Sequence, residues 1–186
     1  MARSTISDAE LLDRSTVVFR THGFEGTSLS RLSEATGLEK ASLYHRFPGG
    51  KEEIALAVAG GVFAWFQEHV FEPLKRADSP PKKIRVVTEQ LRAFYVDGTM
   101  PCALDALSLS GGGDELAAAL KGALLAWLRA FSEVARESGL SAVEARRRAE
   151  QAVIQIEGSL ILGRVLGDTK AFRRALEELP GLLTGG

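Results

Sequence analysis

The chain has 186 residues, of which 45% are hydrophobic and 25% charged. This composition is typical of a compact globular protein and too apolar for a disordered one. The formal net charge of −1 excludes a molecule that attracts nucleic acid as a whole, so any DNA binding must rest on a local patch.

The small numbers of cysteines and histidines, together with the hydropathy of the chain, exclude further classes of protein. A single cysteine, Cys102, excludes an intrachain disulfide and fits a reducing compartment, and three histidines are too few and too scattered for a zinc module. The N-terminus has no apolar signal core, and no run of about 18 apolar residues occurs. We therefore expect a cytoplasmic protein without a membrane span, a metal site or a cofactor.

Three short helices are predicted before residue 50. Residues 7–10 have the spacing of a capping box, Ser-Asp-Ala-Glu, and the apolar stripe that follows them is expected to end at Gly23. A second helix is expected to begin at Thr27 or Ser28 and to end at Gly37, and a third covers about residues 39–47.

Longer helices follow, and no alternating pattern favours a strand. They are expected over about 51–72, 80–95, 114–137, 142–166 and 169–179, while residues 98–113 are ambiguous. The sequence thus predicts an all-α fold with a boundary near Gly50. Residues 1–50 would form a three-helix DNA-binding domain, and residues 51–186 a helical ligand-binding and dimerisation domain.

Residues 27–47 have the pattern of a helix-turn-helix. Apolar residues on the inner faces allow the two helices to cross, and Gly37 supplies the left-handed turn that glycine adopts at little cost. The outer or end positions of the second helix carry polar side chains, namely Lys40, Ser42, Tyr44, His45 and Arg46. A helix of this width fits a major groove. The hydroxyl of Thr27 or Ser28 at a helix N-terminus and the amine of Lys51 could contact phosphates.

The N-terminal pattern resembles the TetR family of bacterial transcriptional regulators. The resemblance is carried by Phe19, Gly23-Phe24, Thr27, Gly37, Leu43-Tyr44-His45-Arg46-Phe47 and Lys51-Glu52. The run 47–53, together with Cys102, Trp127 and residues 157–160, is similar to the LmrA/YxaF-type subgroup.

The resemblance implies roles for single residues. Thr27 and Ser28 would position the protein on phosphates, with Tyr44, His45 and Lys51 clamping the DNA backbone. Lys40, Ala41 and Ser42 would face base edges. Two positions depart from the family pattern. Ser33 stands where alanine is usual, and its hydroxyl is expected to bond back to the preceding turn. Ala41 stands where glycine is common, and its methyl could contact a thymine methyl.

The aromatic residues in the second half of the chain have two possible roles. Aromatic residues at helical spacing are either core or part of a pocket, and the resemblance implies a pocket for a small effector between these helices. Our hypothesis is an effector that is apolar, and aromatic or cationic in character. The expected lining of the pocket is Phe66, Phe94, Cys102, Trp127 and Gln155.

Residues 152–166 are apolar around most of the helix circumference. They form either a central core helix or a homodimer interface, in which this helix and the last one pair with their copies as a four-helix bundle. A two-fold dimer would place two recognition helices about 34–36 Å apart and would require a palindromic operator. Effector binding would shift the helix that begins at Lys51 and release a repressor, with co-repression as the opposite outcome.

Two other functions compete with this interpretation. An enzyme would have to depend on Cys102 and a distant histidine, and no catalytic motif accompanies them, so no enzymatic activity is expected. A thiol reagent should leave DNA binding intact. A helical adaptor that binds only protein is the second alternative, and salt-dependent retention on DNA discriminates it.

Overall fold

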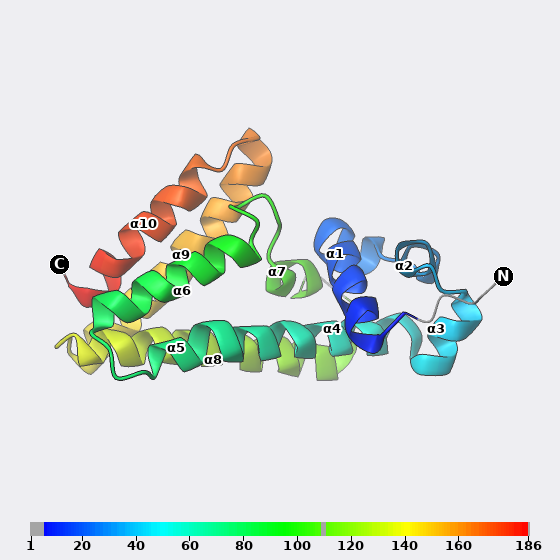
Figure 1. Ribbon diagram of the computed structural model, residues 1–186, viewed down its shortest axis with the longest axis horizontal. Coiled ribbons are helices and arrows are strands. Elements are labelled where there is room, and N and C mark those ends of the chain that lie inside the picture. Colours follow the sequence, from blue (N-terminus) through cyan, green and yellow to red (C-terminus); the bar gives the residue numbers. More distant parts are fainter. Residues whose placement is uncertain (1–5, 109–110, 186) are drawn as a thin grey trace. The chain divides into compact units, whose positions relative to one another are not determined.

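The computed structural model describes residues 6–108 and 111–185, and every regular element within these ranges is helical, which confirms the all-α prediction (Figure 1). In chain order the elements are α1 (Asp8–Gly26), α2 (Leu29–Thr36), α3 (Lys40–Arg46), α4 (Gly50–Phe66), the π-helical segment η1 (Gln67–Phe71), α5 (Glu72–Leu74), α6 (Pro80–Phe94), α7 (Ala103–Ser108), α8 (Gly113–Glu137), α9 (Ala142–Leu166) and α10 (Lys170–Thr184).

The described residues group into two compact units. The first spans 1–63 and 103–122, and the second spans 64–102 and 123–186. The division falls inside α4 and inside α8, so each of these helices contributes to both units. The sequence-based limits, 1–50 and 51–186, follow the turn between α3 and α4 and stay a prediction.

The first unit is built around one apolar core to which several helices contribute. Phe19 of α1, Leu32 of α2, Leu43 of α3 and Ile54 of α4 are almost completely buried in it. The short helix α7, in the segment that the sequence left ambiguous, packs against α1 and adds Leu107. Burial of side chains from separate helices in one core is the main favourable term that fixes α2 and α3 in place.

The start of α1 has the predicted cap, but its end differs from the prediction. The Ser7 hydroxyl accepts from the Glu10 N–H at 3.2 Å, while the Glu10 carboxylate pairs with Arg14 instead of reaching back to Ser7. At Gly23 the backbone leaves the helix (φ 69°, ψ 176°), and the helix then continues to Gly26. Gly23 is therefore a kink in α1 and not its end.

The second unit contains α6, α9 and α10, and α10 packs against both of the others (Figure 1). Tyr95, Trp127, Phe131 and Phe172 are buried in this unit, with Tyr95 and Phe172 in edge-to-face contact at 5.7 Å between ring centroids. Helix α9 begins with a cap of the same kind as α1, since the Ser141 hydroxyl accepts from the Glu144 N–H at 3.2 Å.

A left-handed turn follows α6 and contacts α10. Val96, Asp97 and Gly98 have φ of 48°, 53° and 90°. The Asp97 carboxylate accepts from the Arg173 Nε at 2.8 Å, which ties the turn to α10. A Cβ at position 98 would lie 2.7 Å from the Phe172 ring, so this close approach requires glycine.

One continuous helical stretch in the described part of the chain, Gly50–Leu74, is long and apolar enough to cross a membrane by length and composition alone. The sequence alone predicts no membrane span. The stretch carries Glu52 and Glu53 near its start and buries Ile54, Val58 and Val70 inside the protein. A single stretch of this kind is weak evidence for a membrane span, because core helices of water-soluble proteins pass the same test.

Candidate nucleic-acid interface

The turn between α2 and α3 is held by hydrogen bonds from both sides. Gly37 is left-handed (φ 73°, ψ 9°), and its N–H donates to the Ser33 carbonyl at 2.9 Å. The Ser33 hydroxyl donates to the Leu38 carbonyl at 2.6 Å. The prediction that Ser33 bonds back to the preceding turn is therefore wrong. Its hydroxyl instead ties α2 to Leu38, the residue that follows Gly37 in the turn.

Helix α3 presents most of the residues that the sequence assigned to DNA. Leu43 is buried, whereas Lys40, Ala41, Tyr44 and His45 are exposed, the Tyr44 side chain to 51%. Ser42 is half-buried. The structure thus brings all five assigned residues of α3 together on one short helix whose buried side faces the core.

The two hydroxyl residues that precede α2, Thr27 and Ser28, differ in burial and in hydrogen-bond partner. Ser28 is exposed, and its hydroxyl accepts from the Arg31 N–H at 3.3 Å. Thr27 is only 2% exposed, and its hydroxyl donates to the Gly23 carbonyl at 2.7 Å. The Thr27 side chain is therefore engaged inside the unit, at the kink of α1, while Ser28 lies at the surface.

Two basic side chains near α3 have internal partners. The Lys51 amine donates to the Phe24 carbonyl at 3.0 Å and lies 4.1 Å from the centroid of the Phe24 ring. The Arg46 guanidinium pairs with Asp8 at 2.9 Å and donates to the Ile6 carbonyl at 3.1 Å. Lys40, in contrast, has no ion-pair partner among residues 6–108 and 111–185. Its charge is accordingly available at the surface.

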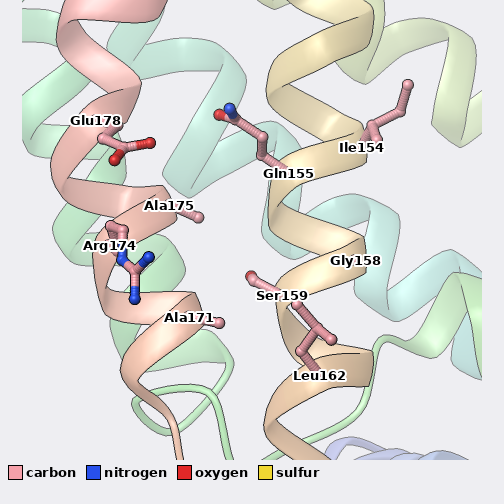
Figure 2. A pocket seen from close by; sticks show the side chains of 9 residues that line it. All are labelled: Ile154, Gln155, Gly158, Ser159, Leu162, Ala171, Arg174, Ala175 and Glu178. Atoms are coloured by element: carbon pink, nitrogen blue, oxygen red, sulfur yellow. The ribbon is translucent and has the colours of Figure 1, made fainter.

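The residues predicted to hold an effector are only partly brought together. The Phe66 ring lies 5.3 Å from Phe94 and 5.1 Å from Trp127, measured between centroids, so these three share one aromatic cluster. Buried Cys102 lies 3.7 Å from the hydroxyl of Tyr95, whose ring touches Phe94. Gln155 lines a groove between α9 and α10 instead (Figure 2).

Sequence reasoning missed polar and aromatic partners of this cluster. His69 stacks on Trp65 at 4.6 Å between centroids, and the Tyr95 hydroxyl lies 3.5 Å from a Glu157 carboxylate oxygen. The interruption of an apolar helix by Glu157 was the available signal for the second contact. His69 lies in η1, whose π-helical register shifts side chains away from positions expected for an α-helix.

Comparison with known proteins identifies the family. The model of the tetR family of bacterial regulatory proteins matches residues 11–58, and that of the C-terminal domain of LmrA/YxaF-like transcriptional regulators matches residues 81–178. The HTH-type transcriptional regulator LmrA of Bacillus subtilis is 24% identical over 182 residues, which are 95% of this chain and 96% of LmrA. The HTH-type transcriptional repressor AcnR of Corynebacterium glutamicum is 40% identical over 57 residues, 31% of this chain and 30% of AcnR.

Solved structures of proteins from this family have the same fold as this chain. A TetR transcriptional regulator from Legionella pneumophila superposes with a TM-score of 0.83 at 17% identity, covering 96% of this chain and 97% of that one. The family is not one of enzymes, in line with the sequence prediction. The chain belongs to the TetR family and is a helix-turn-helix DNA-binding transcriptional regulator with an LmrA/YxaF-like C-terminal domain.

Proposed function

We propose that this regulator is a homodimeric repressor that leaves a palindromic operator in the cytoplasm when a small apolar effector binds. The observation that carries the proposal is the outward presentation of Lys40, Ala41 and Tyr44 on α3 by a fully buried Leu43. A short helix fixed in this way can enter a major groove as a rigid element.

The residues proposed to contact DNA fall into two groups, those that face base edges and those that contact phosphates. Lys40, Ala41 and Ser42 face base edges, while Tyr44, His45 and the N-terminal turn of α2 at Ser28 contact phosphates. Lys51 adds a charge at the same surface, because an ammonium has three donors and only one is engaged with Phe24. Thr27 acts as a positioning residue, since its hydroxyl holds the junction of α1 and α2.

The homodimer is supported by apolar side chains that the chain leaves uncovered on α9. Ile154, Ile161, Leu162, Val165 and Leu166 are all exposed there. Water contact with so many large side chains on one helix is costly, and pairing of α9 and α10 with their copies would remove it. Two-fold symmetry then requires two equivalent half-sites in the operator.

The effector is proposed to bind at the aromatic cluster of Phe66, Phe94 and Trp127. Phe66 is the last residue of α4, whose first part belongs to the DNA-reading unit, so a ligand that moves Phe66 acts on a helix shared by both units. If the ligand prefers the state that does not bind DNA, operator affinity must fall by the same coupling factor.

The test begins with a palindrome in the promoter beside the protein's own gene. Titration of a fluorescent operator duplex should give two protomers per site, and a panel of apolar compounds should quench tryptophan emission. A compound that quenches should also release the operator. One protomer per operator, or tighter operator binding with the quenching compound, would overturn the dimeric or the repressor part of the proposal.

A further inference from the structure

Helix α3 has little apolar support along its own length. All of α3 lies in the described part of the chain, and of its seven residues only Leu43, in the middle, is fully buried. Leu38 and Phe47, which flank the helix, are half-buried against the same core. Burial of apolar surface is favourable but not directional. The two ends of this helix, which is about 10 Å long, are therefore left for directional contacts to hold.

The start of α3 is held through the last turn of α2, by Arg14 of α1. Its Nη1 donates to the carbonyls of Ala35 at 3.3 Å and Thr36 at 3.4 Å, and its Nη2 donates to the Glu10 carboxylate at 2.5 Å. The last four carbonyls of a helix have no partner inside it, and a cation is favourable at this end of the helix dipole. Arg14 thus ties the end of α2, directly before the turn, to α1.

The end of α3 is held by Arg46, the last residue of the helix. Both of its Nη atoms donate to the Ile6 carbonyl at 3.1 Å, and Nη1 also donates to the Asp8 carboxylate at 2.9 Å. The Ile6 side chain is buried in the core of the first unit, so the carbonyl that Arg46 contacts belongs to an anchored segment. Arg46 thus ties the end of α3 to the residues that begin α1.

We infer that Arg14 and Arg46 are positioning residues of the DNA interface, which hold the two ends of α3 on α1 and do not themselves contact DNA. The sequence grouped Arg46 with the DNA-facing side chains of α3, whereas its guanidinium is bonded to Ile6 and Asp8. The charge of each arginine is already paired with a carboxylate. This inference depends on DNA binding alone and is independent of the proposed dimer and effector.

A displaced α3 should affect sequence recognition more than general attraction to DNA. Contacts to base edges carry the sequence information, and contacts to phosphates do not. Hydrogen bonds weaken steeply when their angle departs from the optimum, so base contacts depend on close placement of the helix that makes them. Phosphate charges repeat along every duplex. Release of either end of α3 should therefore weaken binding to the preferred sequence and spare binding to random DNA.

The test replaces each arginine by lysine in the full-length chain. Arg14→Lys and Arg46→Lys keep the positive charge but lose the planar fork that reaches several acceptors at once. Fluorescence anisotropy measures the affinity for two probes, a duplex that the parent chain selects from a random-sequence pool and a duplex of random sequence. Each variant should bind the selected duplex about tenfold more weakly, on the order of one lost base contact, and the random duplex as the parent does. Equal weakening on both duplexes, or none on either, would overturn the assignment.

Two milder variants leave the arginines in place and remove the carboxylates that hold them. Asp8→Asn and Glu10→Gln change side chains that are 83% and 49% exposed, so the fold should tolerate both. Loss of a negative charge from the DNA-binding unit should not weaken attraction to the random duplex. The ratio of the affinity for the selected duplex to that for the random duplex should nevertheless fall. A ratio equal to the parent's in both variants would contradict the positioning roles.

Ile54→Val is the matched control for a general loss of stability. It removes a methylene from the same core and changes no bond to α2 or α3, so the affinity ratio should stay that of the parent. All titrations are made at a temperature at which circular dichroism shows each variant folded. If Ile54→Val lowers the ratio as much as the lysine variants do, the effect is one of stability and the inference is wrong.

Discussion

At the residue scale, the polar side chains around α2 and α3 are of two kinds: some leave their polar groups at the surface, and others bond to backbone carbonyls inside the unit. Lys40 and Tyr44 leave their polar groups at the surface, whereas Thr27 and Lys51 bond to carbonyls of Gly23 and Phe24. Both carbonyls belong to the last turn of α1, next to its kink. We therefore propose that Thr27 only positions the reading helix, that Lys40 and Tyr44 contact DNA, and that Lys51, with N–H donors left over beside its bond to Phe24, does both.

Thr27→Val tests the positioning role, because it keeps the shape of the side chain and removes the 2.7 Å bond to Gly23. Loss of this buried bond should lower the free energy of unfolding by about 1–2 kcal/mol, measured by urea denaturation. Thr21→Val is the matched control, since exposed Thr21 makes the same type of bond to Val17, and it should cost less than about 0.5 kcal/mol. Equal losses in the two variants would contradict the assignment.

Tyr44→Phe tests the contact role. The hydroxyl is proposed to touch a phosphate, so its removal should weaken binding to operator and to random duplex by the same factor, about three- to tenfold. Fluorescence anisotropy titrations of both duplexes measure this. Stability should not change, because Tyr44 is exposed. A loss confined to the operator would show instead that Tyr44 reads a base.

At the scale of elements, caps and apolar periodicity were sufficient to predict most helices. Ser7 begins α1 with the expected hydroxyl bond, and Ser28 and Ser141 cap α2 and α9 in the same way. The apolar pattern also indicated which face of α2 and α3 turns inward, and Leu32 and Leu43 are buried there. This burial pattern made the exposed residues of α3 predictable too.

Features that depend on neighbouring segments were not predictable. The helix continues beyond Gly23 because α7 and the core support the turn after the kink, and six-residue α7 is too short for a periodic signal. The forward bond of Ser33 and the internal partner of Thr27 depend on where backbone carbonyls lie after packing. A sequence pattern does not contain that information.

Gly37→Ala tests the turn between α2 and α3. A methyl group at this position meets no atom within 4 Å, so the only cost is the left-handed backbone, φ 73°. We expect a loss of about 1 kcal/mol in unfolding free energy. Gly122→Ala, inside α8 and equally free of contacts, should instead stabilise the protein by up to about 1 kcal/mol. Differential scanning calorimetry of both variants checks the opposite signs.

The N-terminus of α9 should respond to acid. Hydrogen bonds from Arg147 and Arg148 lower the pKa of Glu144 from 4.5 to about 2. A lowered carboxyl pKa stabilises the fold above pH 4.5, and this contribution is lost as the pH falls from 4.5 toward about 2. The difference in melting temperature between the parent and Glu144→Gln should therefore shrink as the pH falls through that window. A carbon NMR titration of the Glu144 carboxyl should have its midpoint near the lower limit of the window, at about pH 2. A midpoint near 4.5 would contradict the bonding.

At the scale of the whole molecule, a net charge of −1 leaves DNA binding to a few local cations. The logarithm of the operator affinity should fall linearly with the logarithm of salt concentration, with a slope of several. Lys51→Ala should reduce this slope by about two for a dimer, one phosphate contact per protomer. Lys121→Ala, an exposed lysine of α8, is the control that should leave the slope unchanged. An unaltered slope in Lys51→Ala would remove Lys51 from the phosphate contacts.

The turn after α6 has a consequence for how this protein can evolve. A side chain at position 98 would meet two separate costs, because its Cβ would lie 2.7 Å from the Phe172 ring and its backbone would have to keep a φ of 90°. A smaller residue at 172 would remove the first cost and leave the second. Position 98 should therefore stay glycine in descendants of this protein even where position 172 changes.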